Sequence, residues 1–134
     1  MPLTPMPELL QTALTHRYAV GYFECWDQYS LEAVLAAAEE TRSPVICGFG
    51  GVMMQQAWFD GGGLRGLAAL GRALVESATV PVAYLLNEVE TFAQIEQGLA
   101  GGFTAVMLDT SHLPLAENIA QTRRVVTAAH ACCA

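Results

Sequence analysis

The feature that most constrains the fold is a set of short, almost wholly apolar runs separated by helical stripes. The runs do not alternate apolar and polar residues, so strands formed from them are buried on both faces. Between the runs, apolar residues recur three or four positions apart, as on one face of a helix. The predicted strands are residues 18–23, 45–49, 80–86 and 103–108. Strands and helices in this order are typical of a parallel sheet covered by helices, either an open doubly wound sheet or part of a barrel.

The predicted helices have recognisable boundaries. Thr4-Pro5 precedes the first helical stripe, and proline favours the first helical position. Ser30 is the predicted N-cap of the second helix, and Gly101-Gly102 is a predicted C-cap. Pro114 is predicted to start the last helix. Asp60 and the three glycines after it are predicted to form a loop.

Length and composition exclude several classes of protein. The 134 residues are enough for a single domain, 1–134, and 53% hydrophobic against 14% charged residues predict that another surface covers part of this one. No run reaches the roughly 20 apolar residues of a membrane span, and no targeting segment is recognised, so a cytoplasmic protein is expected. The net charge of −7 disfavours nucleic-acid binding. The four cysteines form no C-x-x-C pair, which disfavours a zinc knuckle.

Polar residues follow each predicted strand, where parallel α/β sheets bind ligands. They are Glu24 to Asp27 after the first strand, Gly50 and Gly51 after the second, Asn87 and Glu88 after the third, and Asp109 to His112 after the fourth. Carboxylates that converge there repel one another unless a cation or hydrogen-bond donors compensate them. Magnesium, manganese or calcium would suit such oxygens. The alternative is that these residues cap helices or remain solvated, with Asp109 or Ser111 capping the helix at Pro114.

Several stretches resemble a known family. The most specific is Gly102–Pro114, followed by Glu117-Asn118-Ile119 and Thr122; Tyr18–Phe23, Ala36–Ile46 and Val80–Ala83 add to it. They resemble the N-terminal half of the class II, metal-dependent ketose-bisphosphate aldolases, the fructose- and tagatose-bisphosphate group. The resemblance implies half of a (β/α)8 TIM barrel, with four β-α units preceded by an N-terminal helix. It also implies descent from aldehyde-lyases of carbohydrate metabolism.

The catalytic positions carry different residues from the family pattern. The family ends its third strand with His-x-Asp-His, in which Asp is the acid/base and the last His binds zinc. The matching residues here are Leu85, Leu86, Asn87 and Glu88, so Asn87 and Glu88 occupy the catalytic positions. An asparagine does not exchange a proton near neutral pH, which argues against the family's acid/base step in this chain.

The resemblance also assigns substrate and metal positions. Glu24, Gly50 and Ser111 stand at substrate-binding positions, where the family has Asn at the first and Ser at the second. The predicted metal ligands are Glu24, Glu88, Asp109 and His112. The family uses zinc, whereas a carboxylate-rich set favours magnesium or manganese. The family's other zinc histidines and its phosphate-binding loops belong to the second half of the barrel.

Three interpretations follow. The chain is a diverged aldolase-like enzyme that acts on a sugar phosphate, a non-catalytic half-barrel that self-associates or partners a complete enzyme, or a truncated product stable only through self-association. A complete barrel needs roughly 250 residues, and a half-barrel leaves two apolar strand edges open. We therefore expect a homodimer that closes a pseudo-barrel, or assembly with a complementary half-barrel.

Overall fold

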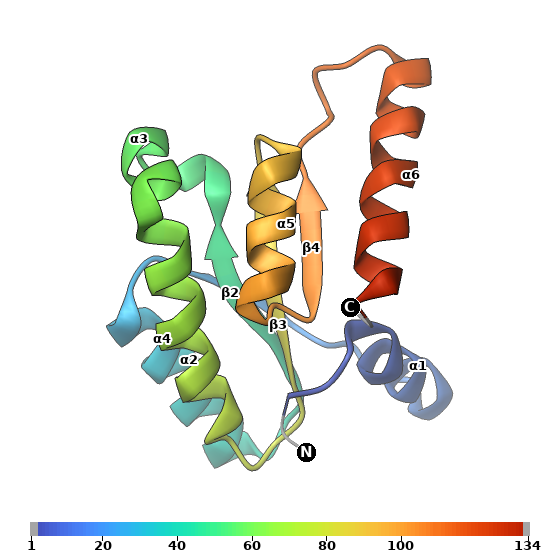
Figure 1. The fold of residues 1–134 in the computed structure, drawn as a ribbon. Helices are drawn as coiled ribbons and strands as arrows, with labels where there is room; N and C mark the ends of the chain where they lie inside the picture. The colour runs from blue at the N-terminus through green and yellow to red at the C-terminus, as the bar shows by residue number, and fades with distance from the viewer. Residues whose placement is uncertain (1–2, 133–134) are drawn as a thin grey trace.

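Four parallel strands alternate with helices in the computed structural model, which describes residues 3–132. The strands are β1 (Tyr22–Cys25), β2 (Val45–Gly50), β3 (Val82–Val89) and β4 (Ala105–Leu108). The helices are α1 (Met6–His16), α2 (Gln28–Thr41), α3 (Gln56–Trp58), α4 (Leu64–Glu76), α5 (Phe92–Gly101) and α6 (Leu115–Ala131). Two further turns, η1 (Gly51–Met53) and η2 (Phe59–Gly63), flank α3. Figure 1 shows these elements in chain order.

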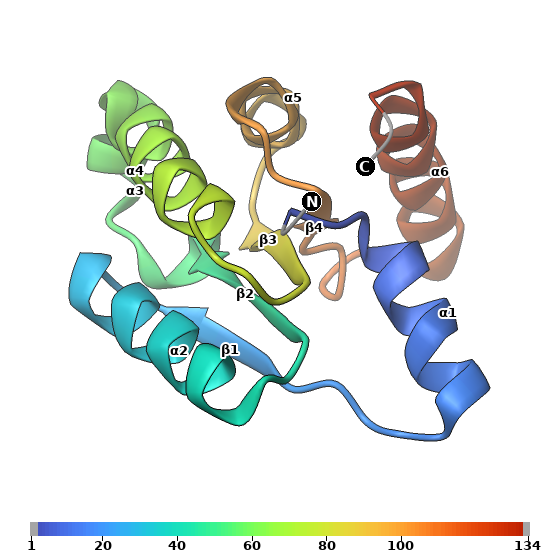
Figure 2. The same cartoon turned by 90° about the horizontal axis from the view of Figure 1, so that it is seen from below.

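The strand order decides between the two sheet architectures that the sequence allowed. The order is β1-β2-β3-β4 and every pairing is parallel. A doubly wound sheet reverses its strand order at a switch point, and no such reversal occurs among these strands. In Figure 2, α2, α4, α5 and α6 form an arc around the strands, and α1 lies at the open side of that arc. This is the predicted half-barrel of four β-α units after an N-terminal helix.

The two faces of the sheet bury different residues. The larger apolar cluster lies between the strands and the outer helices and includes Phe49, Tyr84 and Leu86. The smaller cluster lies on the other face, where Leu9 of α1 packs with Ile46, Ala83, Leu85 and Ala105. Successive side chains of a strand point to opposite faces, so the central strands bury both sets. This explains why their sequences are continuously apolar.

Tyr84 is the centre of the larger cluster. Its ring stacks on Phe103 at a centroid distance of 4.0 Å and meets Phe49 edge-on at 6.3 Å. Its hydroxyl donates a hydrogen bond of 3.0 Å to the carbonyl of Leu67 in α4. A Cβ at Gly71 would lie 2.0 Å from that hydroxyl oxygen, so only glycine lets α4 approach the sheet this closely.

Several predicted boundaries are shifted in the structure. β1 begins at Tyr22 rather than at residue 18, because residues 18–21 form the crossing from α1 to the sheet. The N-cap of α2 is Asp27, and Ser30, predicted for that role, is its N3 partner in a capping box. β3 extends to Val89, so Asn87 and Glu88 lie within the strand rather than after it.

The predicted loop at residues 60–63 is also different. Phe59–Gly63 is a helical turn that joins α3 to α4, with Gly62 at φ 119°. A Cβ at Gly63 would lie 2.5 Å from the indole of Trp58, so the absence of a side chain at Gly63 leaves room for this ring. Gly62, with its positive φ, bends the chain. The predicted C-cap is confirmed, with Gly102 in the left-handed conformation. Across residues 3–132, no helix has the length and apolar character needed to cross a membrane.

Candidate functional site

Glu24 is the centre of a polar cluster at the carboxyl end of the sheet. Its Oε2 accepts hydrogen bonds of 3.0 Å from the hydroxyl of Tyr22 and of 3.0 Å from Nδ2 of Asn87. Burial, reinforced by the Glu24 carboxylate, raises the pKa of Tyr22, so its hydroxyl keeps the proton that it donates. The Glu24 carboxylate is therefore compensated by two donors from β1 and β3.

Gly50 provides the space in which this carboxylate lies. In β2, Gly50 pairs with Asn87 of β3, and a Cβ at Gly50 would lie 2.4 Å from the carboxylate carbon of Glu24. The side chain of Glu24 thus crosses β2 to reach Asn87. The structure brings three of the predicted site residues together, and the contact depends on the missing side chain at Gly50.

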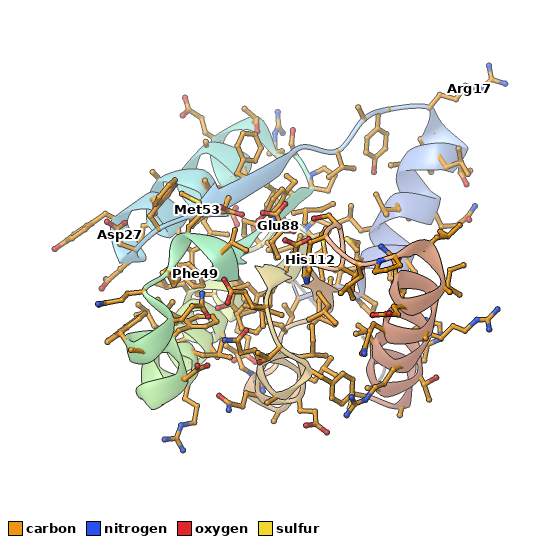
Figure 3. The ribbon with its side chains drawn as sticks, turned by 90° about the horizontal axis from the view of Figure 1, so that it is seen from above. Arg17, Asp27, Phe49, Met53, Glu88 and His112 are labelled. Carbon is orange, nitrogen blue, oxygen red and sulfur yellow. The ribbon has the colours of Figure 1, made fainter. Side chains whose placement is uncertain are left out.

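Glu88 occupies an unusual backbone position beside this cluster. Its φ is 48°, in the left-handed region that side-chain-bearing residues seldom adopt, and the register of β3 with β4 shifts between Leu86 and Val89. The charge of Glu88 also helps to raise the pKa of Tyr22. Figure 3 looks down on this end of the sheet, with Glu88 and His112 near its centre and Asp27 and Arg17 farther out.

Asp109 is held by the loop that follows β4. Its backbone N–H donates a 2.8 Å hydrogen bond to the carbonyl of Val89, and its Oδ1 accepts 3.0 Å from the backbone N–H of Ser111. Hydrogen bonds from the side chain and backbone of Ser111, with a smaller contribution from the charge of His112, lower the pKa of Asp109. Asn118 of α6 donates 3.0 Å to the carbonyl of Thr110 and ties this loop to the helix.

The helix-capping interpretation of these polar residues holds at one position and fails at another. Asp27 accepts from the backbone N–H of Ser30 at 2.8 Å and caps α2, as an isolated strand-end carboxylate was expected to do. Neither Asp109 nor Ser111 caps α6, whose N-cap is Pro114 without a side-chain hydrogen bond. Asp109 instead accepts a hydrogen bond from Ser111 in its own loop, six positions before α6 begins at Leu115.

The predicted metal ligands do not form a complete ligand set in this chain. Within residues 3–132, no group of three His, Cys, Asp or Glu side chains is arranged to hold a metal ion. Glu24 and Asp109 already accept hydrogen bonds from protein donors. His16 and His130, the other two histidines, are in α1 and α6. The donors present therefore do not fit the zinc site of the resembled family.

The buried thiols are not reactive groups. Burial raises the pKa of Cys25 to about 11 and that of Cys47 to about 12, so both are neutral at physiological pH. A neutral, buried thiol is neither a nucleophile nor a ready metal ligand. These two cysteines pack in the larger apolar cluster.

Two residues important for this end of the molecule were missed from the sequence. Tyr22 lies two positions before Glu24 and so shares its face of β1, a relation that strand periodicity predicts.

Gln94 is 1% exposed and joins the 51–63 segment to α5. Its Nε2 donates 2.9 Å to Oε1 of Gln56 and 2.8 Å to Oδ1 of Asp60. Its position three residues after the N-cap Thr91 forms a capping box that the sequence could have revealed.

Comparison with known proteins assigns the chain to a family. A family model described as "Fructose-bisphosphate aldolase class-II" matches residues 4–134. The chain belongs to the class II fructose-bisphosphate aldolase family. A probable fructose-bisphosphate aldolase of Bacillus subtilis is 42% identical over 132 residues, covering 97% of this chain and 45% of that protein. A 6-phospho-5-dehydro-2-deoxy-D-gluconate aldolase of Bacillus licheniformis is 39% identical, covering 95% of this chain and 43% of that protein.

A solved structure supports the fold assignment. The YdjI aldolase of Escherichia coli K12 superimposes with a TM-score of 0.82 and 26% identity, covering 96% of this chain and 47% of that one. The chain thus spans somewhat less than half the length of the family members it matches, and the matched part is their N-terminal half. Family members are metal-dependent, and no group of three possible metal ligands occurs within residues 3–132 of this chain.

Proposed function

We propose that this chain is the N-terminal half of a class II aldolase-type barrel, and that it does not perform aldol cleavage without a complementary half. The observation that carries the proposal is the hydrogen bond from Nδ2 of Asn87 to Oε2 of Glu24, at 3.0 Å. Asn87 stands at the position of the family's acid/base aspartate. Its amide neither gains nor loses a proton near neutral pH, and it instead donates a hydrogen bond that orients a carboxylate.

The second support is the set of groups available to a metal ion. Glu88 stands at the position of a family zinc histidine, and no three-ligand group occurs within residues 3–132. In an assembled barrel, Glu88 and His112 are the side chains of this half that would be available to a cation whose remaining ligands come from the other half.

Sugar phosphates are the substrate class we propose for the assembled barrel. Two relatives are named for aldolase activity, toward fructose bisphosphate and toward 6-phospho-5-dehydro-2-deoxy-D-gluconate. Glu24, Gly50 and Ser111 would face such a substrate, because they lie at the carboxyl ends of the strands. Their chemistry suits the hydroxyl groups of a sugar better than its phosphate, which a carboxylate repels. A cytoplasmic location stays a prediction from the sequence.

An aldol-cleavage assay tests this proposal. The purified chain is incubated with fructose 1,6-bisphosphate or tagatose 1,6-bisphosphate and with zinc, magnesium or manganese in turn, and release of triose phosphate is followed. We expect no release above the rate without protein. The proposal would be overturned if the chain alone cleaves the substrate and this activity is lost in Glu24→Gln but kept in Glu96→Gln. Glu96 is at an exposed position of α5 and serves as the control.

A further inference from the structure

The two oxygens of the Glu24 carboxylate have different surroundings. Both protein donors, the hydroxyl of Tyr22 and Nδ2 of Asn87, bind Oε2 at 3.0 Å. Oε1 accepts no hydrogen bond from any residue in the range 3–132. Each oxygen of a carboxylate can accept hydrogen bonds, so the accepting capacity of Oε1 is unused. The protein thus holds Glu24 through one oxygen and leaves the other open.

Asn87 carries a second open acceptor. Its side chain is only 9% exposed, and its Nδ2 is occupied by Glu24. Its Oδ1 has no donor among residues 3–132, although no fully buried side-chain oxygen or nitrogen in this range lacks a partner. Oδ1 therefore belongs to the small part of Asn87 that remains accessible. Deeply buried polar side chains normally have their hydrogen bonds satisfied, so this open oxygen points to a ligand position.

Both open acceptors lie on the concave face of the sheet, which α1 covers (Figure 2). Leu85 of β3 belongs to the apolar cluster on that face, and Asn87, two residues later in the strand, shares its direction. Gly50 pairs with Asn87 and leaves the space through which Glu24 reaches it. The two oxygens therefore meet at the carboxyl end of the strands, where parallel α/β sheets bind ligands.

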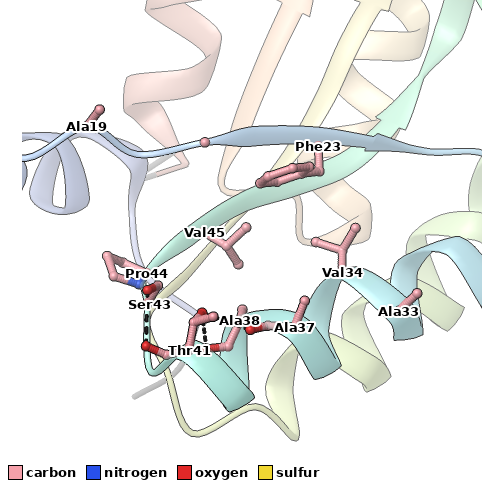
Figure 4. A pocket seen from close by; sticks show the side chains of 11 residues that line it. Ala19, Phe23, Ala33, Val34, Ala37, Ala38, Thr41, Ser43, Pro44 and Val45 are labelled. Carbon is pink, nitrogen blue, oxygen red and sulfur yellow. Dashed lines mark hydrogen bonds between the residues drawn. The ribbon is translucent and has the colours of Figure 1, made fainter.

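β1 separates this polar position from an apolar groove. Phe23 lies between Tyr22 and Glu24, so its side chain points to the opposite face of the strand. There it lines a groove of about 510 Å³, with Ala33 and Ala37 of α2 on the other wall. Figure 4 shows the ring of Phe23 above this row of alanines. None of the residues that line the groove is charged, so the two faces of β1 suit different ligands.

The negative charge beside Asn87 has no cationic partner in the described chain. Within residues 3–132, the single ion pair joins Arg72 and Glu76 of α4. The carboxylates of Glu24 and Glu88 both act on the hydroxyl of Tyr22 and raise its pKa. A partly buried charge without an ion partner is costly, and a ligand of opposite charge offsets that cost. The expected ligand is therefore a hydrogen-bond donor with a positive charge.

We infer that Oε1 of Glu24 and Oδ1 of Asn87 bind a primary ammonium group, and that the sugar phosphate handled by the assembled barrel carries an amino group. The inference rests on the proposed function, because it places this group on the substrate proposed there. An ammonium group offers three N–H donors around one positive charge, which matches two open acceptors beside two carboxylates.

Other ligands match these acceptors in fewer respects. A guanidinium binds both oxygens of a carboxylate at once, and Oε2 of Glu24 is already occupied by protein donors. A sugar hydroxyl has one proton to donate and leaves the charge uncompensated. A divalent metal ion would find no group of three His, Cys, Asp or Glu ligands within residues 3–132. Each of these ligands is an outcome of the test below.

Nuclear magnetic resonance titrations of the full chain test the ligand. Three sugars that differ at one carbon are added in turn at neutral pH: D-glucosamine with an ammonium group, D-glucose with a hydroxyl, and N-acetyl-D-glucosamine with a neutral amide. We expect the side-chain amide of Asn87 and the backbone amide of Gly50 to shift with D-glucosamine, with a Kd about tenfold lower than that for either other sugar.

Four outcomes would overturn the inference. They are signals of Asn87 and Gly50 that stay unchanged with D-glucosamine, equal Kd values for the three sugars, shifts confined to Ala33 and Ala37 in the apolar groove, and tighter binding of guanidinium or magnesium ions than of D-glucosamine at Asn87. The third would show that the amino sugar binds through apolar contacts. The last would show that the open acceptors serve another cation.

A charge-removing variant locates the site. Glu24→Gln keeps the size of the side chain and an oxygen for the bonds from Tyr22 and Asn87, and it should raise the Kd for D-glucosamine about tenfold. Its Kd for D-glucose should change less than about twofold, and the control Glu96→Gln, at an exposed position of α5, should change neither. The amide spectrum of each variant checks that the fold is kept.

Unchanged binding of D-glucosamine by Glu24→Gln would overturn the assignment to this carboxylate. The readout is binding, so it is independent of the aldol-cleavage assay. Cleavage by the chain alone would overturn the proposed function, whereas the loss of amine selectivity would overturn only the inference drawn here.

Discussion

The central and outer strands of this sheet differ in how completely they are buried. Seven of the eight residues of β3 are buried, whereas β1 has one buried residue of four. Phe23 of β1 is 52% exposed and Tyr84 of β3 is fully buried, although both are large aromatic residues in apolar runs. The difference indicates that the stability of the isolated chain comes from the centre of the sheet, and that β1 at its edge leaves large apolar side chains exposed.

The largest expected effect compares these two aromatics. Tyr84→Ala should lower the free energy of unfolding by about 3–5 kcal/mol, because it removes a fully buried ring and leaves a cavity. Phe23→Ala should lower it by less than about 1 kcal/mol in the chain alone, since half of that side chain is already in water. Urea denaturation of both variants measures the contrast. Equal losses would show that β1 is part of the stabilising core and would remove the distinction.

An intermediate effect is expected at Gln94, which joins α5 to the segment after β2. Gln94→Leu would leave the backbone N–H groups of Glu90 and Thr91 without the acceptor they now share, at a cost of about 1–3 kcal/mol. Hydrogen exchange should become faster in residues 51–63, because the bonds to Gln56 and Asp60 are also lost. Gln97→Leu, at an exposed position of the same helix, is the control. Unchanged exchange in 51–63 would show that other contacts hold this segment.

The smallest effect is expected at the exposed end of β1, where Asp27 caps α2. Hydrogen bonds from the backbone and side chain of Ser30 lower the pKa of Asp27 below 3.8, its value in an unfolded chain. Its contribution to stability is therefore complete above that pH and is lost as the pH falls through the folded-state pKa. The unfolding free energy of the protein should fall relative to that of Asp27→Asn as the pH drops below 3.8. Parallel pH profiles for the two proteins would show that this cap does not depend on charge.

Local sequence signals predicted most of the fold. The four apolar runs and the stripes between them indicated four β-α units, and Gly102 was identified as a C-cap because the left-handed conformation favours glycine. The predicted N-cap of α2 was wrong by three residues, because a capping box contains two residues that each look like a cap. Asp27 and Ser30 could be distinguished only by where the helix begins.

The sequence predicted which residues gather at this edge of the sheet but not the contacts between them. Parallel strands end at the same edge, so the sequence placed Glu24, Gly50 and Asn87 there together. That Glu24 crosses Gly50 to accept from Asn87 depends on the register of three strands, which no local pattern encodes. The role of Gln94 likewise depends on Gln56 and Asp60, which are 38 and 34 residues away in the sequence.

The sequence by itself determined the order and type of the elements and the edge of the sheet at which polar residues gather. These follow from burial and from backbone preferences, which act over a few neighbouring residues. Only the tertiary structure decided which carboxylates are already satisfied by protein donors, and that α1 packs on the concave face of the sheet. Those facts depend on distances between residues remote in the chain, and packing alone fixes such distances.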